Sequence, residues 1–142
     1  MYVYKRKINY HETDKMGITH HSNYIKFMEE ARVGFLEEIG LPFQDVEALG
    51  IVSPVIGLEI EYKHPSVFSD VLDVAVCFSV YNGVKFELLY TITNAKTGDV
   101  VATAKSKHCF MKDGKIYSFK RDKNPMDEKL QAAFDADSCA KN

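Results

Sequence analysis

Residues 22–39 carry one wide apolar stripe of helical period, which must be buried against another part of the chain. Spacings of three and four residues of this kind predict a long amphipathic helix. Such a helix is about 27 Å long, enough to cross a small domain. Ser22 or Asn23 suits its N-cap, and Gly40 suits the position just past its end. The stripe consists of Tyr24, Phe27, Met28, Ala31, Phe35, Leu36 and Ile39.

The remainder of the chain predicts mainly strands joined by tight turns. Asn82-Gly83 is a strong hairpin signal, and Asp113-Gly114 marks a further turn. Strands are expected over 4–10, 55–63, 70–81, 85–93, 100–111 and near 116–117, a short helix over 42–49, and a last helix over 126–134 in a C-terminal segment of about 125–142. The economical arrangement is α+β, with a single domain over residues 1–142 in which one antiparallel sheet packs on the long helix.

Length, charge and cysteine content narrow the class of protein. A chain of 142 residues can bury roughly 68–70% of its unfolded surface without disulfides or metal. A net charge of −2 gives no electrostatic case for nucleic acid or an anionic membrane, and no segment approaches 18 consecutive apolar residues. Cys77, Cys109 and Cys139 are an odd count without close spacing, so we expect free thiols in a reducing cytoplasm.

Residues 11–23 follow neither the helix nor the strand period, and they hold three histidines, two acids and a glycine. They predict a loop of the kind that carries catalytic residues. A zinc site is not expected, because the histidines match no HxxxH pair and no acid stands in ligand register with them. The histidines considered are His11, His20, His21, His64 and His108.

Two motifs carry a resemblance to a known family. The first is Tyr10-x-Glu12-Thr13-Asp14-x2-Gly17-x2-His20-His21-x-Asn23-Tyr24, followed in the helix by Glu29-x2-Arg32; the second is Glu61-Tyr62-x2-Pro65-x4-Asp70. Together they resemble the 4-hydroxybenzoyl-CoA thioesterase-like group over roughly residues 4–117. An aspartate, a glycine three residues later and a histidine before a long helix rarely coincide, so the first motif is specific.

The resemblance implies a hotdog fold, in which an antiparallel sheet of five to six strands wraps around one long central helix. It also implies a homodimer with active sites at the subunit interface, or a homotetramer made of two such dimers. The implied activity is hydrolysis of acyl-CoA thioesters without a metal or an organic cofactor, since coenzyme A belongs to the substrate. An acyl-carrier protein is the alternative carrier.

Thioester hydrolysis needs an activated oxygen and a donor for the carbonyl oxygen. The resemblance implies that Asp14 is the catalytic carboxylate, which either attacks the carbonyl or deprotonates a water. It implies that His21 stands at the helix start, with its backbone N–H toward the carbonyl, where the helix dipole favours negative charge. The expected substrate-binding residues are Gly17, Ser22, Asn23, Tyr24, Lys63 and Lys85, the lysines being candidates for contact with the CoA phosphates.

Three further expectations concern Glu12, His20 and the segment around Lys85. Glu12 is expected to be solvated or paired with Arg32, and His20 is expected to be structural. Around Lys85 the family often has a serine and further basic residues, whereas this chain reads Val-Lys-Phe-Glu over 84–87 and departs from that pattern.

Two other classes of function remain open from the sequence. One is a hotdog hydratase or dehydratase, which pairs an aspartate with a histidine to move water across a carbon–carbon double bond. The other is a non-catalytic module that binds acyl-CoA or acyl-carrier protein. The Thr13-Asp14-x2-Gly17 run favours hydrolysis over the first, and the presence of both Asp14 and His21 favours it over the second.

Overall fold

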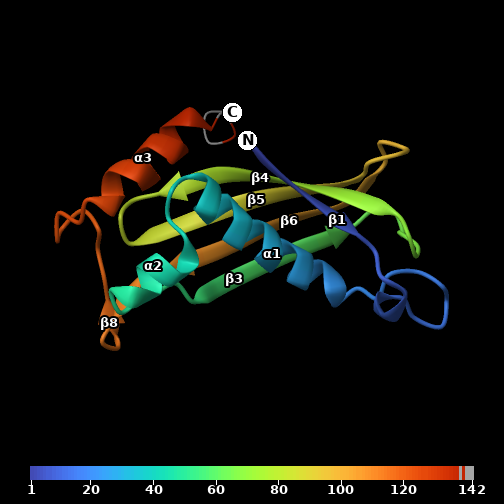
Figure 1. The fold of residues 1–142 in the computed structure, drawn as a ribbon, viewed down its shortest axis with the longest axis horizontal. Coiled ribbons are helices and arrows are strands. Elements are labelled where there is room, and N and C mark those ends of the chain that lie inside the picture. Colours follow the sequence, from blue (N-terminus) through green and yellow to red (C-terminus); the bar gives the residue numbers. More distant parts are fainter. Residues whose placement is uncertain (138, 140–142) are drawn as a thin grey trace.

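A five-stranded antiparallel sheet curves around one long helix in the computed structural model, which describes residues 1–137 and Cys139 (Figure 1). The strand order is β1-β4-β5-β6-β3, and a small second sheet has the order β2-β7-β8. The elements are β1 (Tyr2–Lys7), the 3-10 turn η1 (Tyr10–Glu12), α1 (Asn23–Glu38), α2 (Phe43–Ala48), β2 (Ile51–Val52), β3 (Val55–Tyr62), β4 (Val71–Tyr81), β5 (Lys85–Asn94), β6 (Val100–Cys109), β7 (Met111–Lys112), β8 (Lys115–Ile116) and α3 (Met126–Ala136). The predicted α+β class with one antiparallel sheet is confirmed.

Helix α1 is the centre of the core, as its apolar stripe predicts. All of the stripe residues from Tyr24 to Leu36 are buried. The helix ends in a Schellman motif, in which the Leu41 N–H donates to the Leu36 carbonyl at 2.8 Å and the Gly40 N–H donates to the Glu37 carbonyl at 3.0 Å. Gly40 has φ +87°, which explains why glycine follows the helix.

The hairpin between β4 and β5 forms at the predicted Asn82-Gly83 turn. The Asn82 side-chain oxygen accepts from the backbone N–H groups of Val84 and Lys85, at 3.0 and 2.7 Å, and Gly83 has φ +90°. The first strand, however, ends at Lys7 rather than at residue 10, because residues 10–12 form the turn η1. Strand β2 was not predicted, since two residues are too short to show a period.

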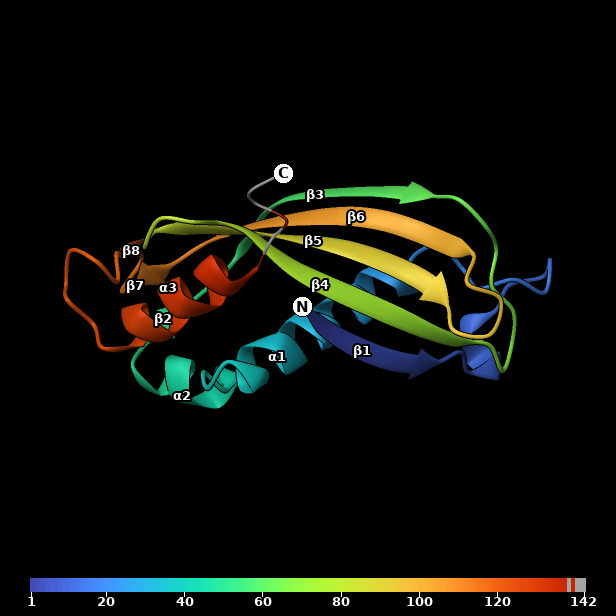
Figure 2. The ribbon, with the colours of Figure 1, turned by 90° about the horizontal axis from the view of Figure 1, so that it is seen from above.

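Strands β1 and β3 are the two edges of the large sheet (Figure 2), and their side chains differ in character. Strand β1 carries Lys5, Arg6 and Lys7, and charged residues of this kind protect an edge from further pairing. Strand β3 instead exposes apolar side chains, among them Ile56 at 52% and Leu58 at 40%. An exposed apolar edge strand is a surface on which another chain can pair.

The cysteine expectation is wrong for two of the three residues. Cys77 of β4 and Cys139 are joined by a disulfide, with their Cα atoms 6.2 Å apart. Helix α3 brings the C-terminal segment over β4, where Asp137 accepts a hydrogen bond from the Phe78 N–H at 2.7 Å. The expected fraying tail lies partly outside the described residues, since 138 and 140–142 are not among them.

Counting thiols tests this disulfide. Protein purified without reductant and unfolded in denaturant is expected to show one reactive thiol per chain, that of the buried Cys109. After reduction the count is expected to rise to three. A count of three before reduction would contradict the disulfide. In the control variant Cys139→Ser, Cys77 has no disulfide partner, so the thiol count is expected to be the same before and after reduction.

Candidate active site

A cleft of about 330 Å³ lies at the N-terminal tip of α1. It brings together four of the predicted residues, and its lining consists of Asp14, Ile18, Thr19, His21, Tyr24, Tyr62, Lys63, His64 and Pro65. The lining comes from the loop before α1, from α1 itself, and from the end of β3 and the loop that follows it. Helix α2 lies at the other end of α1 (Figure 1).

The loop that holds Asp14 is a closed turn. The Asp14 N–H donates to the Ile18 carbonyl at 2.9 Å, and the Gly17 N–H donates to the Asp14 carbonyl at 3.0 Å. Gly17 has φ +79°, so it permits the reversal that the sequence predicted. One carboxylate oxygen of Asp14 accepts from the Met16 N–H at 2.8 Å. The other oxygen makes no hydrogen bond to any described residue, which leaves it for a water or a substrate.

Three backbone amides at the helix tip already have acceptors. The Ser22 N–H points to Nδ1 of His20 at 3.3 Å, and the Asn23 N–H donates to the His20 carbonyl at 3.0 Å. The Tyr24 N–H donates to the His21 carbonyl at 3.3 Å. The His21 N–H, by contrast, has no acceptor in the described part of the chain. It is therefore a donor available at the tip, where the helix dipole favours negative charge.

Ring contacts hold the segment before α1 in place. The rings of His20 and His21 stack with centroids 4.2 Å apart, and the Tyr62 hydroxyl donates to the His21 carbonyl at 3.1 Å. Ser22 is the N-cap residue, but its hydroxyl bonds to Nδ1 of His20 at 2.8 Å rather than to a helix amide. His20 thus contacts its own segment, and its structural role stays a prediction.

Glu12 holds the loop in place. Its partner is Arg6, and not Arg32 as the sequence suggested. Its carboxylate is 3% exposed and accepts from both Nη atoms of Arg6, at 2.8 and 2.7 Å, and from the Asn9 N–H at 2.8 Å. Its carbonyl accepts from the His20 N–H at 2.8 Å and from the Asn23 side-chain amide at 2.9 Å. Glu12 thus ties β1 to the tip of α1.

The Glu12 environment also sets its charge. Burial by itself would raise the pKa of this carboxyl. The hydrogen bonds from Arg6 and the Asn9 N–H, together with the Arg6 charge, outweigh burial and lower the pKa below its usual value. The group is therefore a fixed anion at neutral pH.

A buried hydroxyl cluster forms the back of the cleft. The Tyr24 hydroxyl and the Thr19 hydroxyl each lie 2.7 Å from the Ser66 hydroxyl, and burial raises the pKa of Tyr24. These contacts join α1, the loop that precedes it and the β3–β4 connection. Sequence reasoning missed Ser66, because it follows no period and its partners are more than 40 residues away.

The remaining predicted residues lie in different places. Gly17 and Ser22 are exposed, and Asn23 is buried with its side chain on the Glu12 carbonyl. Lys63 lines the cleft and pairs with Glu61 at 2.8 Å. Of these four residues only Lys63 lines the cleft.

Lys85 is not brought to the cleft of its own chain. It pairs with Cys109 at one end of β6, whereas Tyr62 of the cleft pairs with Ala102 near the other end. Seven residues of β6 separate these positions, about 24 Å at 3.4 Å per residue. The prediction that Lys85 binds substrate finds no support within one chain, because the antiparallel register carries it away.

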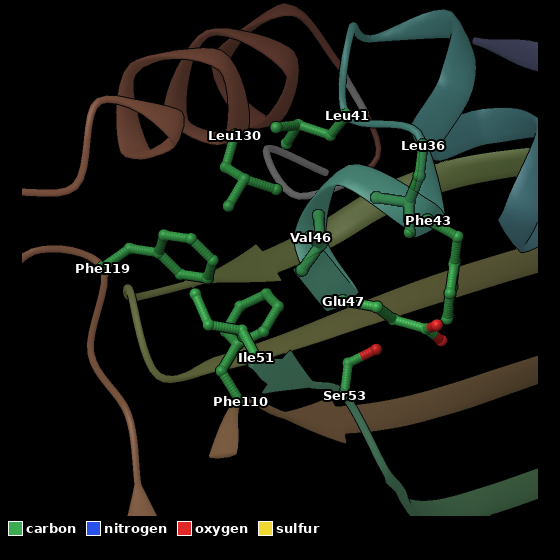
Figure 3. Close-up of a pocket in the computed structure, with 10 residues that line it drawn as sticks. All are labelled: Leu36, Leu41, Phe43, Val46, Glu47, Ile51, Ser53, Phe110, Phe119 and Leu130. Atoms are coloured by element: carbon green, nitrogen blue, oxygen red, sulfur yellow. The ribbon is translucent and has the colours of Figure 1, made fainter. Parts of the chain in front are cut away.

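A second cavity lies at the other end of α1, beneath α2 and α3 (Figure 3). Its lining is apolar, with Leu36, Phe110, Phe119 and Leu130 among the side chains that meet there. Its volume of about 20 Å³ holds at most about one water, so it is part of the core and not a ligand site.

Two further observations concern metal and membrane. Among the described residues, no cluster of three or more His, Cys, Asp or Glu side chains is arranged to hold a metal ion. In the same part of the chain, no helix has the length and apolar character needed to cross a membrane.

Comparisons with known proteins agree on one family. A sequence profile of the thioesterase-like superfamily matches residues 8–134. The long-chain acyl-CoA thioesterase FadM of Escherichia coli is 33% identical over 98 residues, which cover 69% of this chain and 74% of FadM.

Two crystal structures superpose closely on this chain. A hypothetical protein from Aquifex aeolicus gives a TM-score of 0.83 at 33% identity, covering 92% of this chain and 99% of that one. The DHNA-CoA thioesterase of Staphylococcus aureus gives 0.82 at 29% identity, covering 92% and 90%. The predicted hotdog arrangement is thereby confirmed.

Proposed function

This chain belongs to the thioesterase-like superfamily, and from that premise we propose that it hydrolyses acyl-CoA thioesters with Asp14 as the catalytic carboxylate. The observation that carries the proposal is the cleft that Asp14 and His21 share at the tip of α1. The reaction needs two groups there: a carboxylate oxygen and a backbone N–H, each free of hydrogen bonds to the described residues.

The chemistry follows from these two groups. As an oxygen adds to the thioester carbonyl, negative charge grows on the carbonyl oxygen, and the His21 N–H with the helix dipole would stabilise it. The C–S bond then breaks, and CoA leaves as the thiol after taking up a proton. If water attacks, the acyl group is released directly as a carboxylic acid; if Asp14 attacks, the acyl group forms an anhydride with Asp14, and a water must hydrolyse that anhydride to release the acid. The attacking oxygen comes either from Asp14 itself or from a water that Asp14 deprotonates.

A thiol-release assay tests the proposal directly. Wild-type protein is expected to release free CoA from acyl-CoA substrates across a series of short, aromatic and long acyl groups, each measured as thiol. Release of CoA is specific to hydrolysis, because a hydratase would consume an unsaturated acyl-CoA without freeing thiol and a binding module would bind it without turnover. Binding without any thiol release across the series would reject the proposal.

The complete site is proposed to require a second copy of the chain, with β3 as the contact. The exposed apolar residues of β3 and its unpaired backbone edge support a homodimer, and two such dimers would form the tetramer. Tyr62 and Lys63 lie at the end of this strand and also line the cleft. The partner would therefore approach each active site closely, and it is the expected source of further contacts to CoA. A cytoplasmic location and the choice between CoA and an acyl-carrier protein remain predictions.

The β3 contact predicts an effect on assembly. Ile56→Lys, placed on an exposed apolar side chain of β3, is expected to convert the dimer to monomer and to lower thiol release per chain. Light scattering after size-exclusion chromatography measures the first effect. Val3→Lys, at the opposite edge strand and of similar exposure, at 49% against 52%, is the matched control. A dimer that survives Ile56→Lys and dissociates in Val3→Lys would assign the contact to β1.

A further inference from the structure

Another cavity, separate from the cleft and from the core cavity beneath α2 and α3, has a volume of about 130 Å³ and lies between α1 and the strands β3, β5 and β6. We name it the polar-floor cavity. Its mouth has apolar side chains that include Ile25 and Leu58, and its floor consists of Arg32, Tyr90, Ser106 and His108, each at most 6% exposed. Tyr24 lines the candidate active site, and Met28, one helical turn further along α1, lines this cavity. The two spaces thus lie on neighbouring turns of α1, which makes this cavity a candidate space for the acyl group.

The guanidinium of Arg32 has no carboxylate partner. No ion pair among the described residues includes it. Within residues 1–137 and Cys139, its hydrogen bonds are all made by Nη1, at 3.3 Å to Nδ1 of His108 and at 3.4 Å to the carbonyl and hydroxyl of Ser53. A buried cation without a counter-charge is costly, and an anion that enters beside it relieves that cost.

Two nitrogens of Arg32, Nε and Nη2, make no hydrogen bond to a described residue. No side-chain nitrogen or oxygen in that part of the chain is enclosed without a partner. These two atoms are therefore not fully enclosed, and Arg32 is one of the side chains that line the polar-floor cavity. They offer two N–H donors to a ligand in the geometry that suits a carboxylate.

The rest of the floor also consists of donors. His108 accepts from Arg32 at Nδ1, so Nε2 carries the ring proton and donates to the Ser106 hydroxyl at 2.7 Å. Burial, and then the Arg32 charge, lower the pKa of His108 to about 3, which agrees with a neutral ring. Ser106 and Tyr90 share one hydrogen bond of 2.7 Å. Of their two hydroxyl protons, one is left without an acceptor among the described residues.

We propose that the polar-floor cavity binds a carboxylate at the far end of the acyl group, with Arg32 as its partner, so that the preferred substrates are acyl-CoAs of dicarboxylic acids. The proposal rests on the proposed thioesterase function. Glu29 is the one carboxylate among the residues that line the cavity, but it is exposed, so water and salt screen it, whereas Arg32 is buried. Arg32 is therefore a specificity residue and not a catalytic one.

The first test needs no variant. The values of kcat/KM for thiol release are compared between straight-chain acyl-CoAs and acyl-CoAs of the same length that end in a carboxylate, from short to medium chains. A charge-assisted contact is worth about 10- to 100-fold, so at one chain length the carboxylated substrate is expected to exceed its neutral match by at least about ten-fold. Neutral substrates hydrolysed equally well or better at every length would overturn this proposal and leave the thioesterase function intact. No thiol release from either series would instead reject the function itself.

The second test removes the cation. Arg32→Gln is expected to lower kcat/KM for the carboxylated substrate by about 10- to 100-fold and to leave the neutral match nearly unchanged, and Arg32→Lys is expected to restore part of the loss. Arg121→Gln removes the same charge from an exposed position paired with Asp122 and serves as the control. Equal losses on both substrates, or a dimer that dissociates, would show that Arg32 is a structural or interface group.

Discussion

Asp14→Asn is expected to lower kcat for acyl-CoA hydrolysis by about 10²- to 10⁴-fold, the contribution typical of a positioned acid or base. An amide neither attacks a thioester at a useful rate nor deprotonates a water, so the loss holds for both routes. KM is expected to change little, because the cleft and the helix tip remain as they are. Thiol release under saturating acyl-CoA measures the effect.

The folded structure is expected to tolerate this substitution. The side-chain oxygen of asparagine can accept the same hydrogen bond from the Met16 N–H that Asp14 accepts at 2.8 Å. Asp113→Asn is the matched control, since it changes an exposed turn aspartate in the same way at φ +55°, a conformation that asparagine also adopts. Full activity in Asp14→Asn would refute the catalytic assignment, whatever the activity of the control.

Glu12→Ala is expected to lower the free energy of unfolding by about 3 kcal/mol, near the lower end of the range for breaking a buried ion pair. The lower end applies because Arg6 keeps a second carboxylate, that of Glu30, at 2.9 Å. Urea denaturation measures the change. The loop that carries Asp14 would also lose its anchor, so thiol release is expected to fall.

An exposed ion pair of the same strand is the control for Glu12→Ala. Lys5 and Asp73 lie 2.8 Å apart, with the lysine 69% exposed, and such pairs contribute at most about 1 kcal/mol. Asp73→Ala is therefore expected to cost much less than Glu12→Ala. Equal losses of unfolding free energy in the two variants would show that the buried Glu12 contacts stabilise the fold no more than the exposed ion pair does.

The lowered pKa of Glu12 predicts how stability depends on pH. A carboxyl with a lower pKa in the folded state binds fewer protons there than in the unfolded state, so it stabilises the fold above its unfolded value of about 4.5. That stability is lost as the pH falls through the lower folded value. Glu12→Gln is expected to flatten this acid limb in urea denaturation between about pH 5 and pH 2. An unchanged limb would contradict the shift.

The sequence by itself determined most of the elements and the class of fold. The stripe of α1, the Asn82-Gly83 hairpin and the Gly40 stop depend on short-range sterics and on which face of a segment is apolar. These properties are local, so a single chain displays them. The motif with Asp14 and His21 likewise identified the loop that the structure places at the cleft.

Only the tertiary structure decided which distant side chains meet. Glu12 pairs with Arg6 and not with Arg32, because β1 lies beside the catalytic loop while Arg32 points toward His108, which is 76 residues away in the chain. Register moved Lys85 to the far end of the sheet, and the docking of α3 brought Cys139 to Cys77 across 62 residues. Contacts of this kind depend on how the chain brings distant segments together and on which charges are left unpaired when they are buried. The hydrophobic period of a single segment carries no information about either.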